Sequence, residues 1–257
     1  MVRLRSYFPK SRGKPRVDDR RVLSGIIFIN RNGLRWCDAP VAYGPPKTLY
    51  NRWKRWSDAG VFARIMTGLA AEAPDNKTIS IDATYLKAHR TASSLRLKKG
   101  SFGRLIGQTK GGMNTKLHAV TDTSGRPIRF FLTAGQVSDY TGAAALLSSL
   151  PEADWLLADR GYDADWFREA LSYRGTRPCI PGRKSRKKLV RYDKRRYKRR
   201  NRIERMFGRL KDWRRVATRY DRCPKVFLSA IALAATVIFW LCVLNLVHLC
   251  LTPTFLK

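Results

Sequence analysis

Acidic residues are scarce in this sequence. Its 257 residues include 19 Asp and Glu against 52 Lys and Arg, which gives a formal net charge of +33 at pH 7. This balance is far outside the range of an ordinary metabolic enzyme. It favours a polyanionic partner, because neutralising phosphates releases their counterions. Nucleic acid is the partner that the charge predicts, and an anionic membrane surface is the competing partner.

Paired cysteines are absent and histidines are few. The five cysteines form no CxxC pair and no Cys/His zinc spacing. We therefore expect them to be buried free thiols in a reducing compartment. With three histidines, a histidine mechanism has few candidates, and we expect each histidine to be structural. These residues are Cys37, Cys179, Cys223, Cys242, Cys250, His89, His118 and His248.

The N-terminus lacks the apolar core of a signal peptide. One segment, Val226–Leu251, carries no charged residue over 26 positions and is long enough to span a membrane. The alternative is a helix buried inside a soluble protein. We favour the buried helix, because several small and polar residues dilute its hydrophobicity. The sequence thus predicts no membrane partner and a cytoplasmic, nucleoid-associated protein.

The first 74 residues are expected to form a small helical domain. One helix begins at about Asp19 and is stopped by Asn32-Gly33, a second begins near Thr48, and a third covers Val61–Ala73. Three short helices with one basic face suggest a helix-turn-helix-like DNA-binding unit. The alternative is an ordinary helical subdomain whose arginines are only solvated.

The second of these helices has an apolar side and a basic side. Leu49 and Trp53 fall on the apolar side, while Arg52, Lys54 and Arg55 point away from it. We predict that these three cations contact DNA.

The middle of the chain alternates between strand and helix patterns. Two short apolar strands each end in an aspartate, Asp82 and Asp159. The pattern predicts an α/β domain with a mixed sheet flanked by helices, over residues 75–250 and followed by a tail at 251–257. The expected strands are Thr78–Asp82, Lys116–Asp122, Ile128–Thr133, Trp155–Ala158 and Arg177–Ile180, and the expected helices are Ser138–Leu150 and Ala164–Arg174.

The stretch GQTKGG lies in a Gly/Lys/Ser-rich connection at roughly 91–114. It lacks the residue order of a P-loop, and no helix pattern follows it. We expect a flexible basic loop there.

The positive charge is concentrated in residues 183–222, which hold 20 Lys and Arg against 4 Asp and Glu. Within this run, a helical wheel at 100° per residue places Tyr197, Arg200 and Lys211 within about 40° of Glu204. Ile203, Phe207 and Leu210 form a neighbouring apolar stripe. One edge of the helix therefore packs, and the next edge presents a carboxylate framed by two cations and a phenol. The alternative is a solvated basic helix whose glutamate only tempers repulsion.

The spacing Tyr-x2-Arg-x3-Glu-x6-Lys, filled by Tyr197, Arg200, Glu204 and Lys211, resembles the motif around the third acid of DDE-type bacterial insertion-sequence transposases. The stretch RNGLRWCDAP…YNRWKRWSDAGVF resembles the N-terminal domain of the same family. The family's version of that domain begins further upstream, which leaves open that this chain lacks an opening helix. The resemblance covers nearly the whole chain.

The resemblance implies a ribonuclease-H-like fold in which Asp82, Asp159 and Glu204 are the three catalytic acids and the metal ligands. Two Mg²⁺ or Mn²⁺ ions are the implied cofactors, and three carboxylates are suitable ligands for such hard cations. Arg200 and Lys211 would hold phosphates or orient Glu204, and Tyr197 would pack or contact DNA.

The implied reaction is metal-dependent cleavage of DNA strands, followed by joining of the 3′-hydroxyl ends to target DNA. Double-stranded DNA, as element ends and as target, is the implied partner, and a homodimer on DNA is the implied assembly. Two alternatives stay open at this point. One is a ribonuclease-H-like nuclease that cuts without joining, and the other is a non-catalytic basic DNA-binding protein, a decayed transposase.

Overall fold

The computed structural model describes residues 2–10, 18–72, 74–93, 102–186 and 189–241. The described residues fall into two compact units. The helical unit takes those within Met1–Leu69, His89–Arg96 and Arg209–Lys257, and the sheet unit takes those within Ala70–Ala88 and Leu97–Gly208. This division differs from the expected domains at 1–74 and 75–250, because described residues from 209 onward group with the N-terminal helices.

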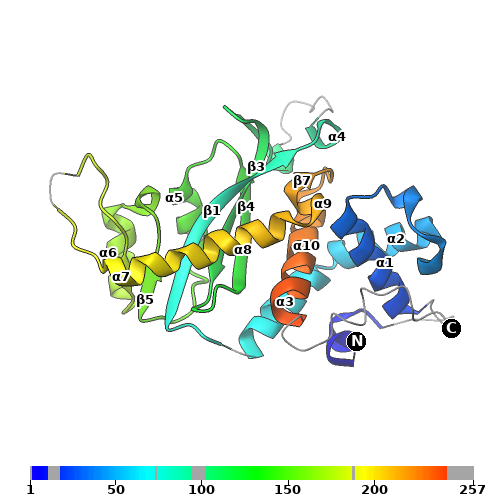
Figure 1. Cartoon of the computed structure of the whole chain (residues 1–257), viewed down its shortest axis with the longest axis horizontal. Helices are drawn as coiled ribbons and strands as arrows, with labels where there is room; N and C mark the ends of the chain where they lie inside the picture. Colours follow the sequence, from blue (N-terminus) through cyan, green and yellow to red (C-terminus); the bar gives the residue numbers. More distant parts are fainter. Residues whose placement is uncertain (1, 11–17, 73, 94–101, 187–188, 242–257) are drawn as a thin grey trace. The chain divides into compact units, whose positions relative to one another are not determined.

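The helical unit is built from both ends of the chain (Figure 1). In its core α10 packs against α1 and α2, and α9 packs against α1 and α10. Its helices are α1 (Asp19–Asn32), α2 (Pro46–Asp58), α3 (Val61–Glu72), α4 (Arg90–Ser93), α9 (Arg214–Ala217) and α10 (Pro224–Ala235). Its shorter elements are η1 (Val2–Tyr7), η2 (Trp36–Asp38), η3 (Val41–Tyr43), β7 (Thr218–Arg219) and η7 (Thr236–Leu241).

The N-terminal helices follow the local sequence signals. α1 starts behind Asp18, whose side chain accepts the backbone N–H of Arg20, and it ends at Gly33 with φ 73°. In α2, Trp53 and Trp56 are buried with at most 1% of their surface exposed. The predicted start and stop of the first helix and the predicted apolar side of the second are therefore confirmed.

The described part of the chain has one helix, Pro224–Leu241, that is long and apolar enough to cross a membrane. A core helix of a soluble protein passes the same test, and 67% of this segment is buried inside the protein. From Val226 onward nearly every residue of α10 is buried, which fits the apolar sequence of this part of the helix. The rest of the segment predicted from sequence, up to Leu251, lies outside the described residues.

The sheet unit holds a mixed sheet. The strand order is β2–β3–β1–β5–β6, and β4 also pairs with β3. β1 and β3, like β3 and β4, are antiparallel, whereas β5 pairs with β1 and β6 with β5 in parallel. The strands are β1 (Thr78–Ala88), β2 (Gly107–Thr109), β3 (Gly112–Thr121), β4 (Pro127–Ala134), β5 (Trp155–Leu157) and β6 (Arg177–Cys179). The helical segments of this unit are η4 (Phe102–Arg104), α5 (Asp139–Leu147), η5 (Arg160–Tyr162), α6 (Asp165–Tyr173), α7 (Lys194–Tyr197), η6 (Lys198–Arg200) and the greater part of α8 (Asn201–Lys211).

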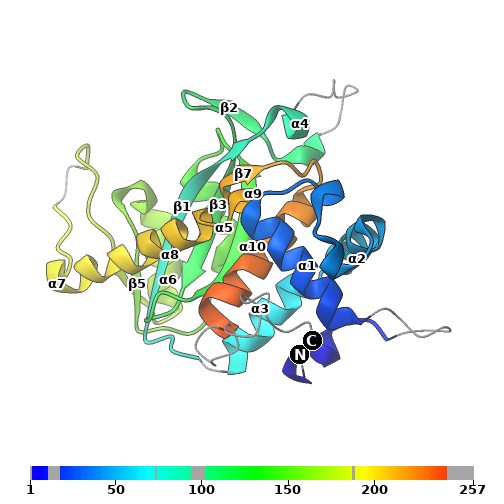
Figure 2. The ribbon, with the colours of Figure 1, turned by 45° about the vertical axis from the view of Figure 1, so that its right-hand side comes forward.

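Helices α5 and α8 cover opposite faces of this sheet. Side chains alternate between the two faces along a strand. The neighbours Asp82 on β1 and Ala119 on β3 share one face, and Asp82 meets α8 there through Arg200. His118 points to the other face, where it lies against Gly142 of α5. Figures 1 and 2 both draw α8 across the front of the sheet with α5 behind it.

Three expectations from the sequence are wrong in detail. β1 does not end at Asp82 but continues to Ala88, because its second half pairs with the long strand β3. The GQTKGG stretch is not a flexible loop, since Gly107–Thr109 and the start of β3 form a tight antiparallel hairpin. Of the cysteines in the described residues, Cys179 is buried, but Cys37 and Cys223 are exposed because they lie in short surface turns.

The contact between α5 and β3 predicts a stability effect. A Cβ on Gly142 would lie 2.0 Å from Nδ1 of the buried His118 ring. We expect Gly142→Ala to lower the free energy of unfolding by about 1–3 kcal/mol, since the packed ring has little room to move. Gly208→Ala on α8 is the matched control, because no atom lies within 4 Å of its Cβ position. That change should be neutral or stabilising by up to about 1 kcal/mol. Equal urea midpoints for the two variants would contradict the prediction.

Candidate active site

Asp82 lies inside β1 at the point where parallel pairing stops. The last parallel pair of β1 and β5 is Ser80 with Leu157. Oδ1 of Asp82 accepts the backbone N–H of Ala83 at 2.8 Å, and Oδ2 accepts Nη1 of Arg200 at 2.7 Å. The side chain is 15% exposed, so it is a largely buried carboxylate with one charged partner in contact.

Asp159 follows β5 with one residue, Ala158, between them. It lies two residues after the last parallel pair, as Asp82 does on β1, so both acids are at the carboxyl end of the parallel part of the sheet. Oδ1 of Asp159 accepts the backbone N–H of Gly161 at 2.8 Å and caps the short helix η5. The edge of the sheet thus brings two acids from distant parts of the sequence to equivalent positions.

Glu204 comes to the same place through Arg200. One guanidinium donates through Nη1 to Asp82 and through Nη2 to Oε1 of Glu204. The Glu204 side chain is half exposed, at 51%, whereas that of Arg200 is 17% exposed. A single cation therefore bridges an acid of β1 and an acid of α8 that are 122 positions apart.

The pKa of Asp82 reports how close the acids lie. The pKa of Asp82 is raised to about 6, mainly by burial and to a smaller extent by the charges of Asp159 and Glu204. Arg200 and the N–H of Ala83 act in the opposite direction. Burial would lower the pKa of Arg200, but the surrounding negative charges, with Asp82 foremost, outweigh burial and raise it. The three acids therefore act on one electrostatic site.

The other residues of the sequence motif lie along the same helical path. Tyr197 ends α7, and its ring lies 5.8 Å from the Arg200 guanidinium and 5.4 Å from the Tyr192 ring. Lys211 is the last residue of α8, two helical turns after Glu204. The expected single helix from Tyr197 to Lys211 is three consecutive segments, α7, η6 and α8.

The structure adds residues that the sequence analysis did not single out. Tyr162 is fully buried, and its hydroxyl has no hydrogen-bond partner within the described residues. Burial raises the pKa of Tyr162 well above its ordinary value, and the charges of Asp139, Asp82 and Asp159 add to this effect. Oδ1 of Asp139 in turn lies 3.0 Å from Nζ of Lys116. Tyr162 belongs to the DRGYD stretch that starts at Asp159, and that stretch was the available signal.

Among the described residues, no three His, Cys, Asp or Glu side chains are grouped closely enough to hold a metal ion as they stand. The donor chemistry nevertheless fits a hard divalent cation, because Asp82, Asp159 and Glu204 offer only carboxylate oxygens. A cation already bridges two of these acids, namely the guanidinium of Arg200. A metal ion that bridged the same two carboxylates would have to displace Arg200.

The predicted DNA contacts of α2 differ in their surroundings. Arg52 is 12% exposed, pairs with Asp19 at 2.5 Å and lies over the Trp56 ring at 5.5 Å. Lys54 is half exposed and pairs with Asp58 at 2.6 Å. Arg55 is exposed. The three cations are neighbours on α2, and Arg52 contributes most to packing within the helical unit.

The fold has a match among solved structures. The piggyBac transposase in a synaptic complex with hairpin DNA aligns with a TM-score of 0.56, covering 92% of this chain and 68% of that chain. At 7% sequence identity this likeness shows the fold alone. The mixed sheet with helices on both faces is therefore the ribonuclease-H-like fold.

Sequence comparison shows the family to which the chain belongs. Residues 73–239 match the family described as transposase DDE domain, and residues 2–66 match the family described as putative transposase of the IS4/5 family. The chain belongs to the DDE transposases of insertion sequences.

Two curated relatives carry matching names. A putative transposase for insertion sequence element IS6501 of Brucella ovis is 38% identical over 131 residues, which cover 50% of this chain and 99% of that protein. A putative transposase for insertion sequence element IS402 of Burkholderia cepacia is 30% identical over 139 residues, which cover 49% of this chain and 63% of that protein.

The raised pKa of Asp82 predicts a pH effect on the metal-free protein. An aspartate has a pKa near 3.9 in an unfolded chain, against about 6 here, so the protonated form favours folding. The stabilisation that this raised pKa gives the folded protein is at most about 3 kcal/mol. It is fully present below about pH 4 and is lost as pH rises through 6. Asp82→Asn cannot ionise. In EDTA, the free energy of unfolding of this variant should therefore rise relative to that of the native protein between pH 4 and 7.

Asp193→Asn is a control with the opposite sign. The backbone N–H of Arg196 is the main cause that lowers the pKa of Asp193. The free energy of unfolding of the native protein should therefore rise relative to that of Asp193→Asn as pH rises from 3 to 5. A pH-independent difference between Asp82→Asn and the native protein in urea unfolding would refute the assignment of Asp82.

Proposed function

We propose that this transposase binds the terminal inverted repeats of its element, cleaves DNA strands by metal-dependent hydrolysis, and joins the 3′-hydroxyl ends to target DNA. The observation that carries the proposal is the single guanidinium of Arg200 bridging Asp82 and Glu204, with Asp159 within electrostatic range. Like-charged carboxylates repel one another, so a shared position for them calls for a cation.

Asp82, Asp159 and Glu204 are the proposed ligands of two Mg²⁺ or Mn²⁺ ions. When bound, such ions activate the attacking oxygen and stabilise the leaving oxygen of an in-line displacement at phosphorus. The chain contributes the rigid placement of the ligands. β1 is held between β3 and β5, and the cap on η5 fixes the Asp159 carboxylate through Gly161.

Arg200 has a second proposed role. With metal ions bound at the acids, its guanidinium would hold a DNA phosphate or keep Glu204 in place. The ring of Tyr197 lies against the guanidinium of Arg200 and is proposed to orient it. Lys211 is a proposed phosphate contact further along α8. Guanidinium and ammonium groups suit these roles because both donate charge-assisted hydrogen bonds to phosphate oxygens.

The proposed partner is double-stranded DNA, both as element ends and as target. Cleavage and joining act on two element ends at once, which requires two active sites, so we propose a homodimer assembled on DNA. The helical unit is the proposed end-binding part, and α2 carries its proposed contacts. The net charge of +33 supports all of these roles through phosphate neutralisation.

The proposed metal ligands predict a separation of binding from chemistry. Glu204→Gln keeps the shape of the side chain and removes its charge, and Asp82→Asn and Asp159→Asn do the same for the aspartates. Each should lower strand cleavage in Mg²⁺ by more than about 100-fold, since even outer partners of metal ligands cost 10–100-fold when removed. Binding to duplex DNA should stay within a few-fold of native, as these residues are not phosphate contacts.

Glu169→Gln is the matched control, because Glu169 is an exposed carboxylate on α6 of the same unit. It should cleave like the native protein. Cleavage that survives in a pure Glu204→Gln preparation would remove Glu204 from the site. A joining assay with pre-cut ends then separates a transposase from a nuclease that only cuts.

The proposed contacts of α2 predict a change in salt dependence. Replacing Arg52, Lys54 and Arg55 together by Ala should weaken DNA binding and reduce the slope of log affinity against log salt, by about one unit per lost phosphate contact. Arg55→Ala alone tests this with the least risk to folding, because Arg52 also pairs with Asp19. Lys225→Ala, an exposed cation in the first turn of α10, is the control. If the triple variant keeps the native slope of log affinity against log salt, α2 has a structural role only.

A further inference from the structure

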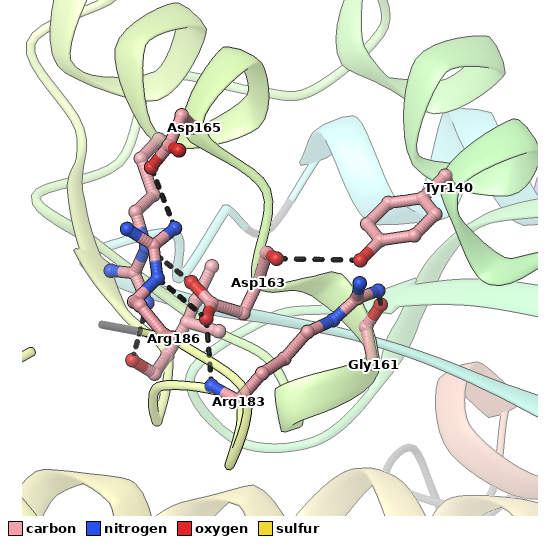
Figure 3. Close-up of polar contacts among 8 residues, drawn as sticks. Tyr140, Gly161, Asp163, Asp165, Arg183 and Arg186 are labelled. Atoms are coloured by element: carbon pink, nitrogen blue, oxygen red, sulfur yellow. Dashed lines mark hydrogen bonds and ion pairs between the residues drawn. The ribbon is translucent and has the colours of Figure 1, made fainter. Parts of the chain in front are cut away.

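A buried carboxylate ties two loops of the sheet unit together. The Asp163 side chain is 0% exposed and lies in the loop after β5. It accepts the backbone N–H of Arg183 at 2.8 Å, Nε of Arg186 at 3.0 Å and Nε of Arg168 at 2.8 Å. Figure 3 shows the bonds from Arg183 and Arg186, in the loop that follows β6, converging on the carboxylate, and the bond from Arg168 comes from α6. Asp163 therefore fixes the backbone of residues 183–186 beside the DRGYD loop.

The anchor is charged at neutral pH. Burial acts to raise the pKa of Asp163, but the N–H of Arg183 and the guanidinium groups of Arg186 and Arg168 outweigh burial and lower it. Arg168 also donates to the carbonyl of Ile180, and Arg186 also donates to Asp165. Both of these guanidinium groups are thus engaged by a carboxylate and serve the structure.

Arg183 differs from these two arginines. Its backbone is held by Asp163, but its side chain runs the other way, under the ring of Tyr140 and toward Gly161 (Figure 3). The guanidinium carbon lies 4.6 Å from the centre of the Tyr140 ring, and Nη2 lies 3.5 Å from the carbonyl oxygen of Gly161. Tyr140 in turn donates its hydroxyl to the carbonyl of Asp163 at 3.3 Å. Arg183 is nevertheless an exposed residue.

The turn that Arg183 reaches is the one that holds a candidate catalytic acid. Gly161 donates its N–H to Asp159 and offers its carbonyl to Arg183. The ring and the carbonyl orient the guanidinium without neutralising its charge, and exposure keeps it accessible to a ligand. A cation held on a ring beside a metal-binding acid is suited to an anion that approaches the same acid.

We propose that Arg183 binds a backbone phosphate of the DNA strand next to the phosphate that is cleaved, with Tyr140 and Asp163 as its positioning residues. The proposal rests on the proposed function, because it places the strand at Asp159. A guanidinium suits this task, since its planar fork can donate two parallel hydrogen bonds to a phosphate. The alternative is a solvated arginine that only stacks on Tyr140 and stabilises the loop.

The test uses duplexes taken from the DNA that borders the gene, each with one phosphate replaced by an uncharged methylphosphonate. Affinity is measured in EDTA, where no cleavage occurs, for the native protein, Arg183→Ala and Lys184→Ala. For the native protein, neutralising one phosphate beside the cleavage position should cost about tenfold in affinity. The affinity of Arg183→Ala should not change when that phosphate is neutralised, and its response at the other positions should match that of the native protein. Lys184→Ala removes an exposed charge from the next residue and should keep the native profile.

A profile for Arg183→Ala that matches the native one would overturn the proposal. The proposal would also be overturned if Lys184→Ala lost its sensitivity to the methylphosphonate at the same position. Failure of this proposal and failure of the proposed function give different results. A native protein that fails to cleave in Mg²⁺ contradicts the proposed function, while the methylphosphonate profile still tests Arg183.

Two substitutions of Tyr140 test its positioning role. Tyr140→Phe keeps the ring under which Arg183 lies and should keep the native profile. Tyr140→Leu removes the ring and should weaken the effect at the same phosphate without affecting others. Arg183→Lys keeps the charge but not the fork, so its loss of affinity at that phosphate should be intermediate. A purely structural Tyr140 would instead lower the unfolding midpoint in Tyr140→Leu with the position-specific profile intact.

Discussion

The active site depends on a balance between like charges that must lie together and the cation that allows it. Asp82 and Glu204 both bond to Arg200, and Asp159 lies near enough to raise the pKa of Asp82. Burial makes the ionised form of Asp82 costly, so the arginine is a structural requirement of the metal-free protein. In the proposed function, divalent cations would take over the role of Arg200 at these carboxylates.

The sheet unit uses its many arginines in two distinct ways. Arg168 and Arg186 form ion pairs with the buried carboxylate of Asp163, and these pairs fix the loops around the site. Arg183 is positioned by an aromatic ring and a carbonyl, which leaves its charge for a ligand. A basic sequence run therefore contains cations that pair with carboxylates and cations that do not, and only the contacts distinguish them. The scarcity of acids matters here, since the single carboxylate of Asp163 engages two guanidinium groups.

Much of the architecture follows from local signals. The first helix starts at its aspartate cap and ends at Gly33, and the hairpin of β3 and β4 turns at Gly125, with φ 84°. These features depend on backbone geometry and neighbouring residues, so the sequence predicts them well. The length of β1 could not be predicted in this way. Its second half is a strand because β3 pairs with it, and that partner lies more than 20 residues away.

The sequence by itself determined the class of the protein, the three acids as candidates and the spacing around Glu204, because charge, motif spacing and periodicity are properties of the chain. Only the tertiary structure decided which partners the individual cations meet. It bridged Asp82 to Glu204 through Arg200, paired Arg52 with Asp19, and set Arg183 beside the turn of Asp159. These pairings join residues far apart in the chain. Their geometry is fixed by strand register and by burial, which no local pattern encodes.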